Sequence, residues 1–269
     1  MLSRLWSVWR ARREAQTLRD YAIPEPLWRL TLLRYPFIAT RSSEELAELR
    51  RLCSLFLSAK EFHGVDGFEV TDEVALAVAA QACLPVLRLG LAAYDGFVGI
   101  VMHAGEVVAQ REFVDEDGVV HRYEEVLAGE AMEGGPLMLA WSEVDSGDPA
   151  SAAPDSIYNV VIHEFAHVLD MGDGLADGVP PLGSTAECER WLDVIEAEWQ
   201  WFCEQVDAGA PTLIDPYGAE SLEEFFAVAA EAFFVAPAEL KWEQPALYKL
   251  LAGYFRQDPA PAIGIGGSP

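Results

Sequence analysis

Two segments in the N-terminal third carry apolar residues at the three- and four-residue spacing of an amphipathic helix. The first covers residues 42–58 and begins with Ser-Ser-Glu-Glu, a run that can cap a first helical turn. The second follows Thr71, where an acidic start leads into an alanine-rich run ending near Leu84. Pro85 cannot continue a helix. The pattern therefore predicts two helices, the second of which ends before Pro85.

After Pro85 the pattern changes to short runs rich in β-branched and aromatic residues, which predict a small β-sheet. The sequence Asp-Glu-Asp-Gly at 115–118 lies between two of these runs and is typical of a hairpin turn, because its Gly accepts a positive φ. The predicted strands cover residues 86–91, 97–103, 107–114, 119–127 and 137–144.

The C-terminal half has mainly helical patterning. A loop over residues 146–154 precedes the strongest predicted helix, which we expect to begin near Asp155 or Ser156. Loops at 172–184 and 208–218 precede a further helix over 221–234, and a tail rich in Pro and Gly at 259–269 is expected to be disordered. These elements predict an α+β fold with a small mixed β-sheet and a predominantly helical C-terminal half.

Composition limits the possible partners and compartments. With 51% apolar residues in 269, the chain can bury an ordinary core, and no segment is long and apolar enough to span a membrane. The formal charge of -26, from 18 basic and 44 acidic residues, disfavours nucleic acid as a partner. The four cysteines form no CxxC pair and are expected to be reduced, and no cleavable signal peptide is evident, so we expect a cytoplasmic location.

The main basic cluster lies in residues 1–20, which we interpret as a basic, amphipathic N-terminal arm. Such an arm can dock on protein, fray as a free helix, or lie on a membrane surface without stable insertion. Its arginines are interleaved with apolar residues: Arg4, Arg10, Arg12 and Arg13 with Leu5, Trp6, Val8 and Trp9.

Residues 163–167 read His-Glu-Phe-Ala-His, the HExxH pattern of zinc hydrolases. Two His residues four apart on a helix lie on one face and can chelate one ion, so His163 and His167 are candidate ligands. Glu164 then lies beside the same opening and can act as a general base. Chance would produce this pattern in roughly one of a hundred such compositions. The surrounding apolar residues are those of a buried helix: Ile157, Val160, Val161, Phe165, Val168 and Leu169.

A catalytic zinc usually has three protein ligands, so a third is required. Asp170 lies three residues after His167 on the same helix face and is one candidate. The predicted helix at 221–234 offers Glu223, Glu224 and Glu231 among apolar residues, where carboxylates need partners. Glu224 and Glu231 are seven residues apart, so periodicity does not choose between them. The remaining histidines are weaker candidates: His63 in a predicted loop, and His103 and His121 in predicted strands.

Four blocks of the chain resemble a known family, the Mlc titration factor A family of bacterial zinc metallopeptidases. These are residues 23–28 (Ile-Pro-Glu-Pro-Leu-Trp), 159–170 around HExxH, 224–228 (Glu-Phe-Phe-Ala-Val) and 248–259, which ends in Phe-Arg-Gln-Asp-Pro. The family's site is gluzincin-like and related to that of the anthrax lethal factor catalytic domain. The resemblance implies a zincin-like fold in one catalytic domain, residues 21–258. Residues 172–210 match only loosely.

The resemblance also implies roles for individual residues. By motif position, His163, His167 and Glu224 would bind one Zn²⁺ per chain, with Glu164 as the general base. Tyr217 lies seven residues before Glu224, the spacing that the family shares with lethal factor, where the phenol stabilises the oxyanion. Glu231 would support the site or be structural. The enteric member is linked to a glucose-responsive transcriptional repressor, which is therefore a possible protein partner.

The sequence thus predicts a zinc-dependent peptidase, aminopeptidase-like on short peptides, in which zinc lowers the pKa of a water and Glu164 removes its proton. The run at 137–144 could offer an edge to an extended peptide, with Trp141 near the cleft. An alternative is a regulatory protein that sequesters a transcriptional repressor, with the zinc site secondary. A third is a metal-dependent hydrolase acting on another bond, which would need the same ligands.

Overall fold

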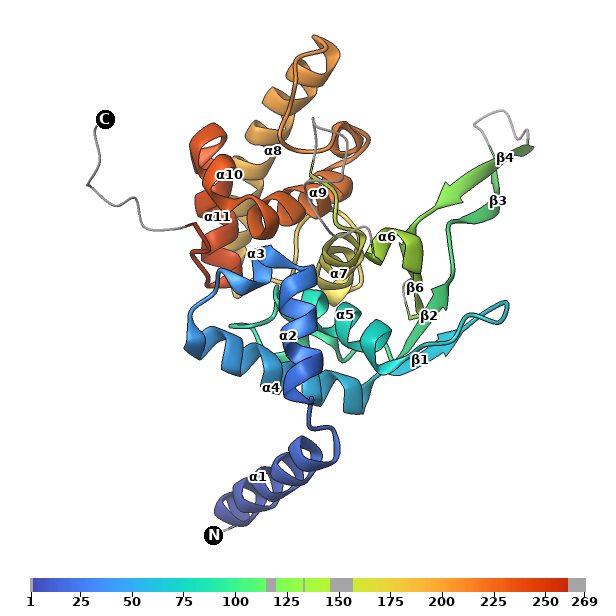
Figure 1. Ribbon diagram of the computed structural model, residues 1–269. Helices are drawn as coiled ribbons and strands as arrows, with labels where there is room; N and C mark the ends of the chain where they lie inside the picture. Colours follow the sequence, from blue (N-terminus) through green and yellow to red (C-terminus); the bar gives the residue numbers. More distant parts are fainter. Residues whose placement is uncertain (1, 115–119, 133, 146–156, 261–269) are drawn as a thin grey trace, which may run out of the picture.

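The computed structural model of the chain describes residues 2–114, 120–132, 134–145 and 157–260 (Figure 1). Within them helices dominate and four strands form a small mixed sheet, which confirms the predicted α+β fold. None of the helices in these ranges is both long enough and apolar enough to cross a bilayer. The N-terminal helices are α1 (Leu2–Asp20), α2 (Glu25–Arg34), α3 (Pro36–Ala39), α4 (Ser43–Ala59) and α5 (Asp72–Cys83).

The two helices predicted in the N-terminal third are confirmed, and their caps explain where they begin. At α4, the Ser42 hydroxyl accepts the Glu45 N–H at 3.3 Å and the Glu45 carboxylate accepts the Ser42 N–H at 3.1 Å. At α5, the Thr71 hydroxyl accepts the Val74 N–H at 3.3 Å. The N-terminal segment forms α1, which projects from the body in Figure 1 and is tied to α4 by an ion pair between Glu14 and Arg51.

The four-stranded sheet has the order β1-β2-β6-β5, with parallel pairing except between β6 and β5. Its strands are β1 (Glu61–Gly64), β2 (Gly99–His103), β6 (Leu137–Ala140) and β5 (Gly129–Ala131). A separate antiparallel pair, β3 (Val107–Val114) and β4 (Val120–Leu127), extends away from it in Figure 1. The turn predicted at residues 115–118 lies outside the described residues.

Two strand predictions were wrong, one wholly and one in part, and the strands β1 and β5 were not predicted. Residues 86–90 form turns, not a strand, because their backbone bonds are local, as between the Gly90 N–H and the Val86 carbonyl at 2.7 Å. β1 was predicted as a loop. The strand predicted at 137–144 ends at Ala140, where α6 (Trp141–Asp145) begins, and β6 lies between β2 and β5. It therefore cannot offer an edge to a peptide, and Trp141 instead packs against Phe68.

The C-terminal half is helical, as predicted. α7 occupies the centre of the molecule, between α5 and α9, and it contributes its apolar side chains to the core (Figure 1). Short 3-10 helices lie in the connecting segments: η1 (Leu91–Tyr94), η2 (Met171–Asp173) and η3 (Pro216–Ala219). The helices are α7 (Val160–Asp170), α8 (Thr185–Asp207), α9 (Leu222–Val235), α10 (Pro237–Glu243) and α11 (Pro245–Phe255).

The predicted disordered tail falls mostly on residues 261–269, outside the described residues. Ala260, which is described, is buried and donates its N–H to the Tyr248 hydroxyl at 3.0 Å. Tyr248 in turn donates to Asp258, which also accepts from Lys241 at 3.2 Å. The segment up to Ala260 is therefore fixed against α10 and α11.

Candidate metal centre

Helix α7 presents three of the predicted site residues to one cavity. It begins at Val160, later than predicted, because the Asn159 side chain caps it by accepting the Ile162 N–H at 2.9 Å. Its hydrophobic side faces the core, and the imidazoles of His163 and His167 stand together on the opposite side, with their Nε2 atoms 3.1 Å apart.

Helix α9 supplies the third member of the cluster. Its cap is Ser221, whose hydroxyl accepts the Glu224 N–H at 3.2 Å, so Glu224 lies in the first turn. The Glu224 Oε2 atom lies 3.1 Å from Nε2 of His163 and 3.3 Å from Nε2 of His167. In the described part of the chain, His163, His167 and Glu224 form the one group whose side chains could jointly hold a metal ion.

Glu231 approaches His163 from behind the cluster. Its Oε1 lies 2.8 Å from Nδ1 of His163, and its other oxygen accepts the backbone N–H of Asn159. Since a carboxylate accepts, Nδ1 of His163 donates its proton to Glu231, which fixes the orientation of the ring. The Asn159 amide continues the network by donating to Gln81 of α5 at 2.7 Å. One buried network thus orients His163 and caps its helix.

Glu164 faces the strand side of the cavity and is only 5% exposed. Gly129 of β5 makes room for it, because a Cβ there would lie 2.5 Å from the Glu164 Oε1 atom. The backbone of Ala131 hydrogen-bonds to the same carboxylate. Burial raises the pKa of Glu164, and the neighbouring histidines reduce that rise. A carboxylate with a raised pKa is suited to accept and return a proton near neutral pH.

The pKa of Glu224, the carboxylate of the cluster, is shifted in the opposite direction. Burial by itself would raise the pKa of Glu224, but its hydrogen bonds with His163 and His167 lower it to about 2. The pKa of His163 is raised: desolvation opposes its charge, but the hydrogen bonds to Glu224 and Glu231 outweigh that effect. Two carboxylates that line one cavity thus have pKa values shifted in opposite directions, a pattern common at functional sites.

Tyr217 lies beside the cluster, on η3. Its ring centroid is 6.2 Å from that of His163, and the residue is 42% exposed. It lines the same cavity, of about 310 Å³, as the cluster and Glu164. The remaining lining residues come from the β4–β5 segment, the 171–176 segment and α9: Leu127, Gly129, Glu130, Ala131, Met171, Ala176 and Glu223.

The structure does not bring the other candidate ligands into the cluster. Asp170 is fully buried, and one of its oxygens accepts the Gly178 N–H at 2.9 Å, so it holds the 172–184 loop. His63 is on β1 and pairs with Glu61 at 3.6 Å, not with the cluster. His103 and His121 lie on β2 and β4.

Sequence reasoning missed Gly129, Ala131 and Gln81. Gln81 had a usable signal, since a polar residue within an apolar, alanine-rich helix needs a hydrogen-bond partner. Gly129 and Ala131 had none, because one acts by lacking a side chain and the other through its backbone.

Comparison with known proteins identifies the family. The sequence model of the family described as glucose-regulated metallo-peptidase M90 matches residues 6–256 of this chain. The chain belongs to this family. An uncharacterised protein of Synechocystis sp. is 38% identical over 257 residues, covering 94% of this chain and 90% of the relative. Membership confirms the resemblance found in the sequence and indicates a metallopeptidase.

Two further relatives carry the name Mlc titration factor A. That of Pectobacterium atrosepticum is 35% identical over 227 residues, covering 83% of each chain. That of Cronobacter sakazakii is 32% identical over 246 residues, covering 87% of this chain and 91% of the relative. The similarity therefore extends over most of both chains, and the family match over residues 6–256 includes α7 and α9.

Proposed function

We propose that this protein is a zinc-dependent peptidase of gluzincin type, with His163, His167 and Glu224 as the metal ligands and Glu164 as the general base. The observation that carries this proposal is the convergence of two imidazole nitrogens and one carboxylate oxygen within 3.3 Å of one another, beside Glu164 in one cavity. The family, a family of metallopeptidases, supports it.

The donor set fits zinc in spacing and in chemistry. Zinc–nitrogen and zinc–oxygen bonds of about 2.0–2.1 Å place tetrahedral ligand atoms roughly 3.3–3.4 Å apart. The three separations here are 3.1, 3.1 and 3.3 Å. Two imidazoles and one carboxylate are a usual protein set for a catalytic zinc, which keeps its fourth position for water or substrate. The Glu231 carboxylate behind His163 is the kind of partner that orients a ligating imidazole.

In this proposal, Glu164 and Tyr217 each have a defined role in peptide hydrolysis. Bound zinc supplies Lewis-acid polarisation and a lowered pKa for water. Glu164 takes a proton from the attacking water and returns it to the departing amine, and its raised pKa suits both transfers. Tyr217, on the cavity wall, donates a hydrogen bond from its hydroxyl group to the oxyanion that forms when the peptide carbonyl is attacked.

The walls of the cavity favour an extended peptide with a free N-terminus. β5 ends the strand order of the sheet, so an extended chain can pair with its outer edge beside Glu164. The cavity is also lined by Glu130 and Glu223, which are not members of the metal cluster. An ammonium group is the natural counterpart of such carboxylates, and this supports an aminopeptidase-like preference.

The deciding experiment measures metal content and peptide hydrolysis together. Purified protein is analysed for bound metals and incubated with a peptide library, with Glu164→Gln and the exposed-site control Glu239→Gln alongside. We expect one zinc per chain in all three proteins, and a loss of about 10²–10⁴-fold in kcat for Glu164→Gln alone. Full activity of Glu164→Gln would show that the mechanism is wrong.

N-terminal preference is tested on the same peptides with free and acetylated amines. Acetylation removes the positive charge, so an aminopeptidase-like site should process the acetylated peptides at least about tenfold more slowly, and Glu223→Gln should narrow the difference. Equal rates on both series would instead support an endopeptidase.

A second candidate function is binding of a transcriptional repressor, favoured by the relatives' name, Mlc titration factor A, which implies that they bind Mlc. Repressor binding and peptide hydrolysis can coexist, since a docking surface need not include the cavity. A binding assay with the repressor of the same genome distinguishes them. Binding that survives His163→Ala, a variant expected to lose the metal, would separate the interaction from the metal centre.

A further inference from the structure

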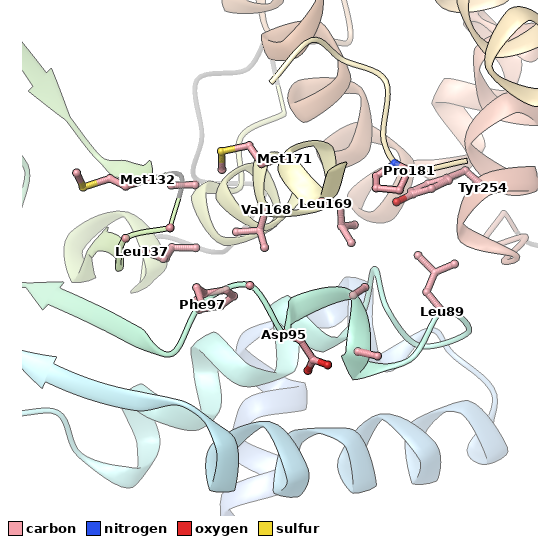
Figure 2. Close-up of a pocket in the computed structure, with 17 residues that line it drawn as sticks. Leu89, Asp95, Phe97, Met132, Leu137, Val168, Leu169, Met171, Pro181 and Tyr254 are labelled. Atoms are coloured by element: carbon pink, nitrogen blue, oxygen red, sulfur yellow. The ribbon is translucent and has the colours of Figure 1, made fainter. Parts of the chain in front are cut away.

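A second cavity adjoins the metal centre and has a different character. Its volume is about 490 Å³, and it shares Ala131 and Met171 with the lining of the metal cavity. Figure 2 shows Val168 and Leu169 pointing from α7 toward the Asp95–Phe97 segment, with Leu137 at one side. Most of its lining is aliphatic or aromatic, in contrast to the carboxylates and imidazoles of the metal cavity.

We propose that this cavity is the pocket that receives a large apolar side chain of the peptide, of the size of Leu or Phe, and so determines substrate specificity. The inference rests on the proposed peptidase function. A hydrophobic pocket with little charge, beside the reacting groups, is the usual setting for side-chain selection.

Position along α7 places this pocket within reach of a bound peptide. Val168 follows the proposed ligand His167 directly, and Met171, the first residue of η2, lies four residues, or about one helical turn, after His167. Ala131 ends β5, the strand whose outer edge would pair with the peptide. Successive residues of an extended chain rise about 3.3 Å and alternate in direction. A residue at the scissile bond, or two positions from it, can therefore point its side chain into this cavity.

Packed backbone holds the cavity walls in place. On one side, Lys60 donates to the carbonyl oxygen of Tyr94 at 2.5 Å and to that of Phe97, and its ammonium lies 3.8 Å from the centre of the Phe97 ring. On the other, a Cβ at Gly172 would lie 2.8 Å from the ring of Pro181, so the loop after α7 packs closely there. Figure 2 shows Pro181 and Tyr254 closing this end.

The charge at the cavity does not favour a cationic side chain. Asp95 is the one acidic residue among the lining residues, and it is exposed. Lys60 already lies close enough to interact with Asp95 electrostatically, so a carboxylate partly balanced in this way offers a substrate Lys or Arg little gain. The cavity is therefore matched to an uncharged, apolar side chain.

The test fills the pocket without touching the metal centre. Ala93 is an exposed residue on η1 that lines the cavity, and Ala93→Trp places a bulky ring in it. The matched control is Val98→Trp, five residues on, at a site 53% exposed and not part of the lining. Peptides that differ only by Ala, Leu, Phe, Asp or Lys at one position near the cleaved bond are compared by kcat/KM.

We expect wild type and Val98→Trp to favour Leu or Phe over Ala by about tenfold or more at one position. Ala93→Trp should reduce that ratio to near one through a lower kcat/KM for the Leu and Phe peptides. The proposal is overturned if no position shows an apolar preference, or if the two Trp variants behave alike. It is also overturned if Lys is preferred and Asp95→Asn abolishes that preference.

A binding measurement separates this proposal from the proposed function. Glu164→Gln, with and without Ala93→Trp, is titrated into dansyl-labelled pentapeptides that differ by Phe or Ala, and fluorescence anisotropy is recorded. Tighter binding of the Phe peptide by about tenfold, lost with Ala93→Trp, supports the pocket even if wild type hydrolyses no peptide. Equal binding of both peptides overturns the pocket even if hydrolysis is found.

Discussion

The two walls of the metal cavity position their residues by different means. On the α9 wall, side-chain carboxylates position the imidazoles. Glu224 lies against both His163 and His167, and Glu231 fixes the orientation of His163. On the β5 wall, Glu164 is held by a backbone group and by the missing side chain of Gly129. Under the proposed function, the first wall would govern metal affinity, whereas the second would govern the rate of the proton transfers. Each wall can be perturbed separately.

The largest effect is expected from Glu224→Ala on the α9 wall. Removal of this proposed ligand leaves two imidazoles, so the metal dissociation constant should rise by more than about 100-fold, beyond the effect of losing a supporting group. Competition with a zinc chelator measures this constant. The neighbouring Glu223→Ala is the control, because Glu223 lines the cavity outside the cluster. Unchanged affinity in Glu224→Ala would remove Glu224 from the ligand set.

Gly129→Ala tests the β5 wall. The added methyl group would lie 2.5 Å from the Glu164 Oε1 atom, so the carboxylate must move. A displacement of about 1 Å in a reacting group can cost on the order of 100-fold, so we expect kcat to fall by roughly that factor at unchanged zinc content. Gly105→Ala is the control, since its nearest contact is 3.9 Å away. Loss of zinc in Gly129→Ala would contradict the division between the walls.

Glu231→Gln is expected to act through His163. A neutral amide is a weaker acceptor for the imidazole N–H, and loss of such supporting partners typically weakens metal binding by about 10–100-fold. The change should appear in the metal dissociation constant, and excess zinc should restore kcat. If kcat stays low at saturating zinc, Glu231 has a role beyond orienting His163.

The smallest effect is expected at Asp170, outside both walls. Burial raises the pKa of Asp170 to about 6, although the Gly178 N–H bond opposes this. The folded protein then retains a proton that the unfolded chain releases above about pH 4, so this contribution to stability is full below pH 4 and declines toward pH 6. Asp170→Asn should flatten the fall in Tm between pH 4 and 7 by a few degrees. The exposed Asp193→Asn should retain the slope of wild type.

The two walls also differ in how visible they are in the sequence. His163, Glu164 and His167 stand out because metal chemistry needs particular side chains at helical spacing. Glu224 and Glu231 were recognisable as buried acids on one helix face, but periodicity did not rank them, and their distances from the imidazoles separate their positions. Gly129 is one of 21 glycines, and its sequence neighbourhood does not indicate that a distant carboxylate needs its space.

Fold prediction succeeded where local chemistry decides the structure. The caps at Ser42 and Thr71 are contained in a few consecutive residues, and both helices formed as expected. The prediction of a strand at residues 86–91 was wrong, because apolar residues, including β-branched ones, suit a buried turn as well as a strand. Likewise, the edge position of β5 depends on β6 pairing on its other side with β2, which lies far upstream in the chain. Long-range pairing of this kind leaves little trace in local pattern.

Under the proposed function, the contact between Asn159 and Glu231 would couple metal loading to the stability of the fold. Glu231 accepts the backbone N–H of Asn159, which caps α7, and the imidazole N–H of His163. The Asn159 side chain in turn donates to Gln81 of α5. A cation that binds the folded state alone at 100 times its dissociation constant adds about 2.7 kcal/mol to the free energy of unfolding. Three helices would share that gain, so removal of the metal with a chelator should speed amide hydrogen exchange in α5, α7 and α9 together.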